Sequence, residues 1–145
     1  MKYLSCLLVC FSFFACTKEH NFSSDFRLTA EIYGGWCGAH KQVIVDEQMT
    51  KIVITQGKCD GNDSTATYKT DLVKFNNLKA KLEQVKFNSL QLHECGRCKD
   101  NIDYKISVFD NGDEYVNVIE AIYQDEDLTA QQQALKELQR AIDAF

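Results

Sequence analysis

The chain has 145 residues and a formal net charge of −5, because 21 Asp and Glu side chains outnumber 16 Lys and Arg. The basic residues form no cluster that could follow a phosphate backbone, which argues against nucleic acid as a partner. The absence of proline excludes a polyproline linker, and the length predicts a single globular domain.

The chain begins with an apolar segment typical of an export signal. Met1 and Lys2 precede an uncharged run, residues 3–15, which Cys16 follows. This run is too short to span a bilayer, which needs roughly 20 apolar residues, and a polar stretch comes directly after it. We therefore expect residues 1–15 to be a signal peptide that is removed.

The end of this segment, Phe13-Phe14-Ala15-Cys16, resembles the lipobox of bacterial lipoproteins. The resemblance implies that Cys16 becomes the new N-terminus and carries fatty acids such as palmitate, which anchor the chain to a membrane; cleavage without lipidation is the alternative. Two or three acyl chains are enough for stable anchoring. Thr17 replaces the aspartate that would imply inner-membrane retention, so the resemblance favours the outer membrane. Residues 16–25 are then the lipidated cysteine and a polar tether, and residues 26–145 the domain.

Four strands are expected at the start of the domain. Residues 27–33 alternate apolar and polar side chains, and β-branched runs follow at 42–45 and 51–55. The loop at 46–50 makes these two runs an antiparallel pair. Residues 65–69 form the fourth strand, after a loop rich in Gly, Asp and Asn.

A helix is predicted next, because apolar residues recur at spacings of three and four: Leu72, Phe75, Leu78, Leu82 and Val85. Thr70 or Asp71 is placed to cap it. Further strands are expected at 89–92, 102–109 and 115–123. A final helix begins with the capping-box pair Thr129 and Gln132. Its apolar stripe comprises Leu128, Leu135, Leu138, Ile142 and Phe145.

The turn Asp110-Asn111-Gly112 allows two registers for the last hairpin. A three-residue loop sets Phe109 opposite Asp113 and matches Tyr104 and Ile106 with Val118 and Val116. A two-residue loop instead sets Ile106 opposite Asn117. Matching the apolar faces favours the three-residue loop.

These elements predict an α+β fold in the order ββββαβββα. About seven strands make a mostly antiparallel sheet, and the two amphipathic helices cover one of its faces.

Cysteine usage agrees with export. Five of the seven cysteines remain after the signal peptide is removed, and lipidation of Cys16 leaves four: Cys37, Cys59, Cys95 and Cys98. In an oxidising compartment we expect these to form two structural disulfides. Three pairings are possible, and the spacing does not choose among them.

The turn Gly35-Trp36-Cys37-Gly38, with the hairpin after it and the order of strands and helices, resembles uncharacterised exported α+β domains of Gram-negative lipoproteins. The resemblance implies the fold and the exported location but carries no activity. Trp36 is the only tryptophan, and in this turn it is either a core side chain or an exposed contact for a partner protein.

Two chemical alternatives remain for the cysteines. Cys95 and Cys98 have the CxxC spacing of thiol oxidoreductases, although the pair leads into a strand and the chain lacks the proline of thioredoxin-like sites. Cys37, His40, Cys95 and Cys98 have spacings suited to zinc, with Cys59 and His93 as substitutes.

No serine lies in a nucleophile motif, so a hydrolase is not indicated. We expect neither an enzyme nor a cofactor. The expected function is a membrane-anchored module that binds or inhibits a partner protein.

Overall fold

The computed structural model describes residues 22–34, 38–58, 61–99, 101–124 and 126–145. The elements are β1 (Arg27–Gly34), β2 (Ala39–Val45), β3 (Met49–Thr55), β4 (Ser64–Lys69), α1 (Leu72–Gln84), the short 3-10 helices η1 (Phe87–Ser89) and η2 (Gly96–Lys99), β5 (Asp103–Asp110), β6 (Asp113–Glu120) and α2 (Ala130–Asp143). The order ββββαββα confirms the predicted α+β class.

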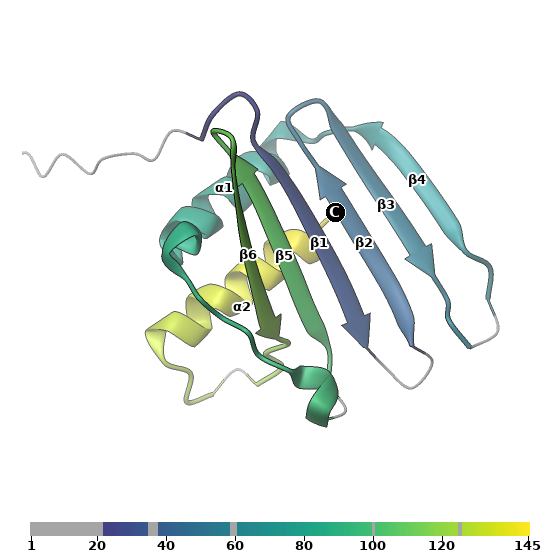
Figure 1. Cartoon of the computed structure of the whole chain (residues 1–145), viewed down its shortest axis with the longest axis vertical. Coiled ribbons are helices and arrows are strands. Elements are labelled where there is room, and N and C mark those ends of the chain that lie inside the picture. Colours follow the sequence, from purple (N-terminus) through teal and green to yellow (C-terminus); the bar gives the residue numbers. More distant parts are fainter. Residues whose placement is uncertain (1–21, 35–37, 59–60, 100, 125) are drawn as a thin grey trace, which may run out of the picture.

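The six strands form one antiparallel sheet in the order β4-β3-β2-β1-β5-β6. Figure 1 shows α1 and α2 on the same side of this sheet, across the half that contains β1, β5 and β6. This arrangement confirms that both helices cover one face. No described helix covers the other face of the sheet, which we call the open face.

The core lies between the sheet and the two helices. Alternate residues of the central strands face the helices, where Leu28 of β1 lies between Val45 of β2 and Val108 of β5. All three are fully buried, and burying side chains of this kind stabilises a fold by about 1.5–3 kcal/mol each. The helices contribute further fully buried side chains, Leu78, Leu82, Leu138 and Ile142. In contrast, every residue of β4 is exposed.

Both helices begin where the sequence predicts. The side chain of Asp71 accepts hydrogen bonds from the first turn of α1, and Thr129 and Gln132 form the capping box of α2. Leu72 was expected on the buried stripe, but its side chain is 48% exposed because the stripe of α1 reaches the core only from Phe75 onward. Among the described helices, none has the length and apolar composition needed to cross a membrane.

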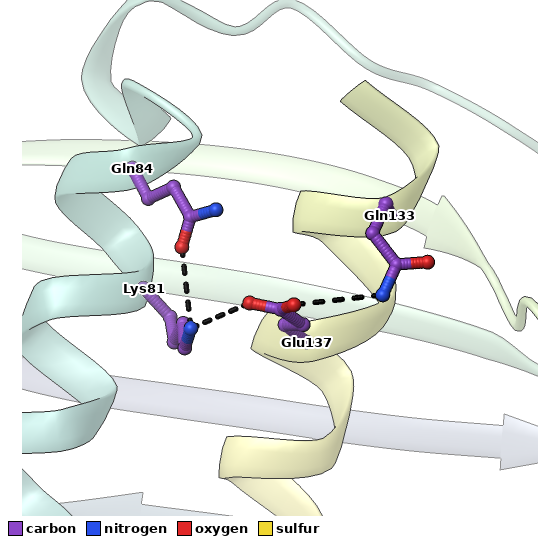
Figure 2. A network of polar contacts seen from close by, with 4 residues as sticks. All are labelled: Lys81, Gln84, Gln133 and Glu137. Atoms are coloured by element: carbon purple, nitrogen blue, oxygen red, sulfur yellow. Dashed lines mark hydrogen bonds and ion pairs between the residues drawn. The ribbon is translucent and has the colours of Figure 1, made fainter. Parts of the chain in front are cut away.

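A polar network joins α1 to α2 on the outer side of the helix layer (Figure 2). The ammonium group of Lys81 donates to Glu137 at 2.5 Å and to Gln84 at 3.2 Å, and Gln133 donates to the other oxygen of Glu137. The hydrogen bond from Lys81 holds the pKa of Glu137 below its ordinary value. These contacts fix how the two helices lie against each other.

The register of the β5–β6 hairpin is not the one that apolar matching predicts. Asn111 and Gly112 form a two-residue loop, both with positive φ, so Asp110 lies opposite Asp113 and Ile106 opposite Asn117. The preferred three-residue loop was therefore wrong. Positive φ at both central residues is the requirement of a type I′ turn, which Asn-Gly satisfies.

The buried amide of Asn117 is the physical reason for this register. Asn117 is 1% exposed, and its side chain accepts a hydrogen bond from the backbone N–H of Leu92 at 2.9 Å and donates to the carbonyl of Phe87 at 3.3 Å. A polar residue with satisfied hydrogen bonds can occupy a core position at little cost. A prediction that matches apolar residues across the hairpin could not detect that Asn117 occupies a core position.

The strand predicted at 89–92 does not form. Ser89 belongs to η1, and the N–H of Leu92 bonds to the side chain of Asn117 instead of to a strand. The segment still runs beside β6, where it makes one isolated parallel bridge, His93 with Val118. The sheet therefore has six strands and not seven.

Residues 22–25 pack onto the domain, although the sequence analysis assigned them to the tether. The carboxylate of Asp25 accepts hydrogen bonds from the backbone N–H groups of Asn111 and Gly112 at 3.0 and 3.2 Å. The hydroxyl of Ser23 and these N–H groups hold the pKa of Asp25 below its ordinary value. The β5–β6 turn thus binds the first described residues of the chain.

Replacing Asn117 by leucine should destabilise the fold by about 1–3 kcal/mol, since the N–H of Leu92 and the carbonyl of Phe87 lose their partner. Urea unfolding followed by circular dichroism measures this change. The same substitution at exposed Asn76 in α1 is the control and should change the free energy of unfolding by no more than about 0.5 kcal/mol. Equal stability of Asn117→Leu and the unchanged protein would contradict the role given to the amide.

Candidate functional site

One end of the sheet gathers the segments that the sequence analysis singled out. Because the strands are antiparallel, β1, β3 and β6 end there and β2, β4 and β5 begin there. We call this the cysteine end and define it by the strand-terminal residues Gly34, Ala39, Thr55, Ser64, Asp103 and Glu120. The opposite end, where residues 22–25 pack on the β5–β6 turn, is the tether end.

All four cysteines expected in disulfides belong to connections at the cysteine end. Cys37 lies in the β1–β2 connection and Cys59 in the β3–β4 connection, whereas Cys95 and Cys98 precede β5. Trp36, Cys37 and Cys59 lie outside the described residues. The strands that flank them begin and end at the cysteine end, so the topology brings these connections to one edge of the molecule.

Cys95 and Cys98 are joined in a disulfide, with an S–S distance of 2.09 Å and a Cα–Cα distance of 5.4 Å. The bridge closes the single turn of η2, and both cysteines are exposed. Of the three possible pairings, only the one that joins Cys37 to Cys59 contains this bridge.

The bridged turn is held against the sheet by hydrogen bonds. The N–H of Gly96 donates to the carboxylate of Asp103, and its carbonyl accepts from the N–H of Asn101 at 2.9 Å. The side-chain amide of Asn101 donates to Glu120 at 2.7 Å, which links the turn to the end of β6. The loop is therefore fixed relative to the strands.

Gly96 is required at this position because the backbone approaches the sheet closely. A Cβ at residue 96 would lie 2.7 Å from a carboxylate oxygen of Asp103 and 2.9 Å from the carbonyl oxygen of Ile102. Neither atom can give way easily, since the first accepts a hydrogen bond and the second belongs to the backbone. No motif in the sequence marks this glycine as special.

A polar hollow of about 460 Å³ lies beside the bridged turn, between the end of β6 and the start of α2. Its lining includes Glu94, Asn101, Glu120, Tyr123 and Gln132. The carboxylate of Glu94 accepts a hydrogen bond from the N–H of Glu120 at 2.8 Å. This acidic side chain of the hollow therefore also holds the loop against β6. The sequence analysis named none of these residues, because they follow no catalytic spacing.

His40 lies on the open face of the sheet, at the start of β2. Its ring stacks on Tyr33 with 4.4 Å between ring centres, and its Nε2 is buried without a hydrogen bond to any described residue. Tyr33 in turn donates to Glu31 at 2.8 Å.

Glu31 is the acidic centre of this part of the open face. It accepts a hydrogen bond from Lys105 of β5 at 3.0 Å and another from Tyr33. Burial acts to raise the pKa of Glu31, but the hydrogen bonds from Tyr33 and Lys105 outweigh it and hold that pKa below its ordinary value. The carboxylate thus stays ionised and ties β1 to β5.

The zinc set proposed from the sequence is not assembled by the described residues. In this structure the sulfurs of Cys95 and Cys98 are bonded to each other, so neither is a thiolate ligand. The described residues bring together no group of three or more His, Cys, Asp and Glu side chains suited to a metal. His93, the substitute ligand, is exposed beside Val118.

Substituting Gly96 by alanine should lower the free energy of unfolding by about 1–3 kcal/mol, because the added Cβ collides with Asp103 and with the carbonyl of Ile102. Gly61→Ala is the matched control, since the three atoms nearest to its added Cβ all belong to the flexible side chain of Gln56 and none to the backbone. Thermal and urea unfolding of both variants measure the difference. If the two variants were equally stable, the bridged turn would not pack as described.

Comparison with protein-family models and with curated proteins finds no match for this chain.

Proposed function

We propose that this protein is a lipid-anchored module of the cell envelope that binds or inhibits a partner protein through its cysteine end. The anchor is the acylated Cys16, in the outer membrane, and the module has no catalytic role. The observation that carries the proposal is the separation of the two ends of the sheet. The described part of the chain starts at the tether end, whereas the bridged turn and the connections that contain Trp36, Cys37 and Cys59 belong to the cysteine end.

The dimensions support this assignment. Only five residues, 17–21, lie between Cys16 and the first described residue, Phe22, and the six Cα–Cα steps that join the two can span at most about 22 Å. The strands have seven or eight residues along most of the sheet, so the cysteine end lies about 25 Å from the tether end. An anchor at Cys16 therefore leaves the cysteine end free for a partner.

Rigidity at the cysteine end also supports binding. A surface that is fixed before a partner arrives loses less conformational entropy when the complex forms. The disulfide of Cys95 and Cys98 and the hydrogen bonds of Gly96 and Asn101 provide such a fixed surface. Thiol-disulfide exchange is less favoured, because a four-residue 3-10 helix followed by a strand lacks the long helix that lowers the pKa of a reactive thiol.

Mass spectrometry of the protein from its native membrane should find a chain that begins at Cys16 and carries two or three acyl groups. Cys16→Ala is the control, since it removes the acylated sulfur and should leave the chain unlipidated and released from the membrane fraction. Recovery of an unmodified chain with Met1 still attached would contradict the anchored location.

Photo-crosslinking tests the binding surface in the intact cell. A photoreactive residue at Lys58, exposed after β3 at the cysteine end, should give one defined adduct with a partner protein. The matched control replaces Glu47, which is exposed before β3 at the tether end and should give no such adduct. Adducts from Glu47 alone, or none from Lys58, would count against the proposal.

The same experiment assesses Trp36. If this side chain contacts the partner, Trp36→Ala should reduce the adduct formed at Lys58 at least severalfold, as expected for a central aromatic contact. An unchanged adduct would remove Trp36 from the binding surface.

A further inference from the structure

The two edges of the sheet differ in how they are covered. Residues 90–94 run along β6, where the N–H of Val118 donates to the carbonyl of Leu92 at 2.8 Å and the N–H of Glu94 donates to the carbonyl of Val118 at 3.0 Å. β4 forms the other edge (Figure 1), pairs with β3 alone among the described strands and has all six residues exposed. An uncovered edge of this kind is a template for another strand.

The hydrogen-bond pattern shows which groups of β4 are unpaired toward solvent. The N–H of Thr70 donates to the carbonyl of Gln48 at 3.2 Å, in register with the β3–β4 pairing. Because hydrogen-bonded and non-hydrogen-bonded pairs alternate in an antiparallel ladder, the N–H and C=O groups of Thr65, Thr67 and Lys69 point away from β3. These three residues present the edge that a further strand would bind.

We propose that a second copy of this chain covers this edge, with β4 pairing antiparallel to its counterpart about a two-fold axis at Ala66. In this register Thr65 lies opposite Thr67 of the second copy, and both have outward backbone groups. Ala66 meets its counterpart in a non-hydrogen-bonded pair, where Cα atoms are only about 4.5 Å apart and a small side chain fits best. The edge strand is thus complementary to itself.

Charge selects this register. The register with the axis at Ala66 sets Lys69 opposite Asp63 of the second copy, and the two-fold symmetry produces that pair twice. Lys69 makes no ion pair with any other described residue, and Asp63 is exposed. The neighbouring register, with the axis at Thr67, would instead set Asp63 opposite Asp71, and like charges directly opposite each other are destabilising.

Exposed apolar side chains beside β4 add contact area. Of the six large hydrophobic residues exposed in the described part of the chain, four gather at the end of β4 and the start of α1: Met49, Tyr68, Leu72 and Val73. Val73 is 80% exposed, so a second copy that covers this cluster would bury apolar surface there. A single exposed charge, Lys69, is the only edge protection that β4 carries.

Pairing at β4 closes after two copies. On the other edge, residues 90–94 already bond to the outward N–H and C=O groups of Val118 in β6, so the combined sheet offers a third copy no second edge as open as β4. A two-fold axis perpendicular to the sheet keeps both helix layers on one side. It also reverses the strands of the second copy, so the two tether ends lie at opposite ends of the combined sheet. The inference does not depend on the proposed function.

Oxidative cross-linking of the full chain tests the register. Ala66→Cys should form disulfide-linked dimers, because its Cα–Cα distance across the axis falls within the range for a disulfide. Thr67→Cys is the matched control, since it lies about 7–8 Å from its counterpart on the diagonal and should link several times less. The unchanged chain under the same oxidant gives the background from its own cysteines. Ala66→Cys at background level, or Thr67→Cys linking better, would overturn the proposal.

A charge exchange tests the pairing without added cysteines. Lys69→Asp should weaken self-association roughly tenfold in analytical ultracentrifugation, and the double change Asp63→Lys with Lys69→Asp should restore it. Circular dichroism of each variant confirms that the fold is retained. A chain that sediments as a monomer at every concentration, or a double variant as weak as Lys69→Asp, would refute pairing in this register.

Discussion

The pairing of β1 with β5 is the interaction on which the rest of the structure depends. It joins a strand near the start of the chain to one about 75 residues later, with Leu28 opposite Val108 and Ala30 opposite Ile106 on the buried face. On the open face the ion pair of Glu31 and Lys105 spans the same two strands. Without this ladder the first four strands and the last hairpin would be separate sheets, and neither could cover α1 and α2 together.

The same ladder determines what meets at each end. Because β5 is antiparallel to β1, the disulfide turn that precedes β5 lies beside the end of β1, where Gly34 packs closely on Ile102. The turn after β5 then reaches the opposite end, where Asp25 accepts its backbone N–H groups. The tether end and the cysteine end are therefore separated by the sheet topology and not by any long linker.

What the sequence could predict was local. Helix caps at Asp71 and Thr129 depend on neighbouring residues, and strand positions follow from alternation along a few residues. The hairpin register failed, because Asn117 is satisfied by backbone groups from a segment that is distant in sequence. For the site, the cysteines could be identified, but their neighbours Glu94, Asn101 and Glu120 follow no motif and become adjacent only through the fold.

Asn117, which explains the wrong hairpin register, also affects how one edge of the sheet is covered. Its amide holds the segment that follows η1 beside β6, and that segment bonds to the outward N–H and C=O groups of Val118. A polar residue in the core thus protects one edge of the sheet from other strands. β4 has no equivalent among the described residues, since its neighbours are β3 on one side and solvent on the other. An edge that the chain leaves uncovered, with complementary charges at its two ends, is suited to pairing with its own copy.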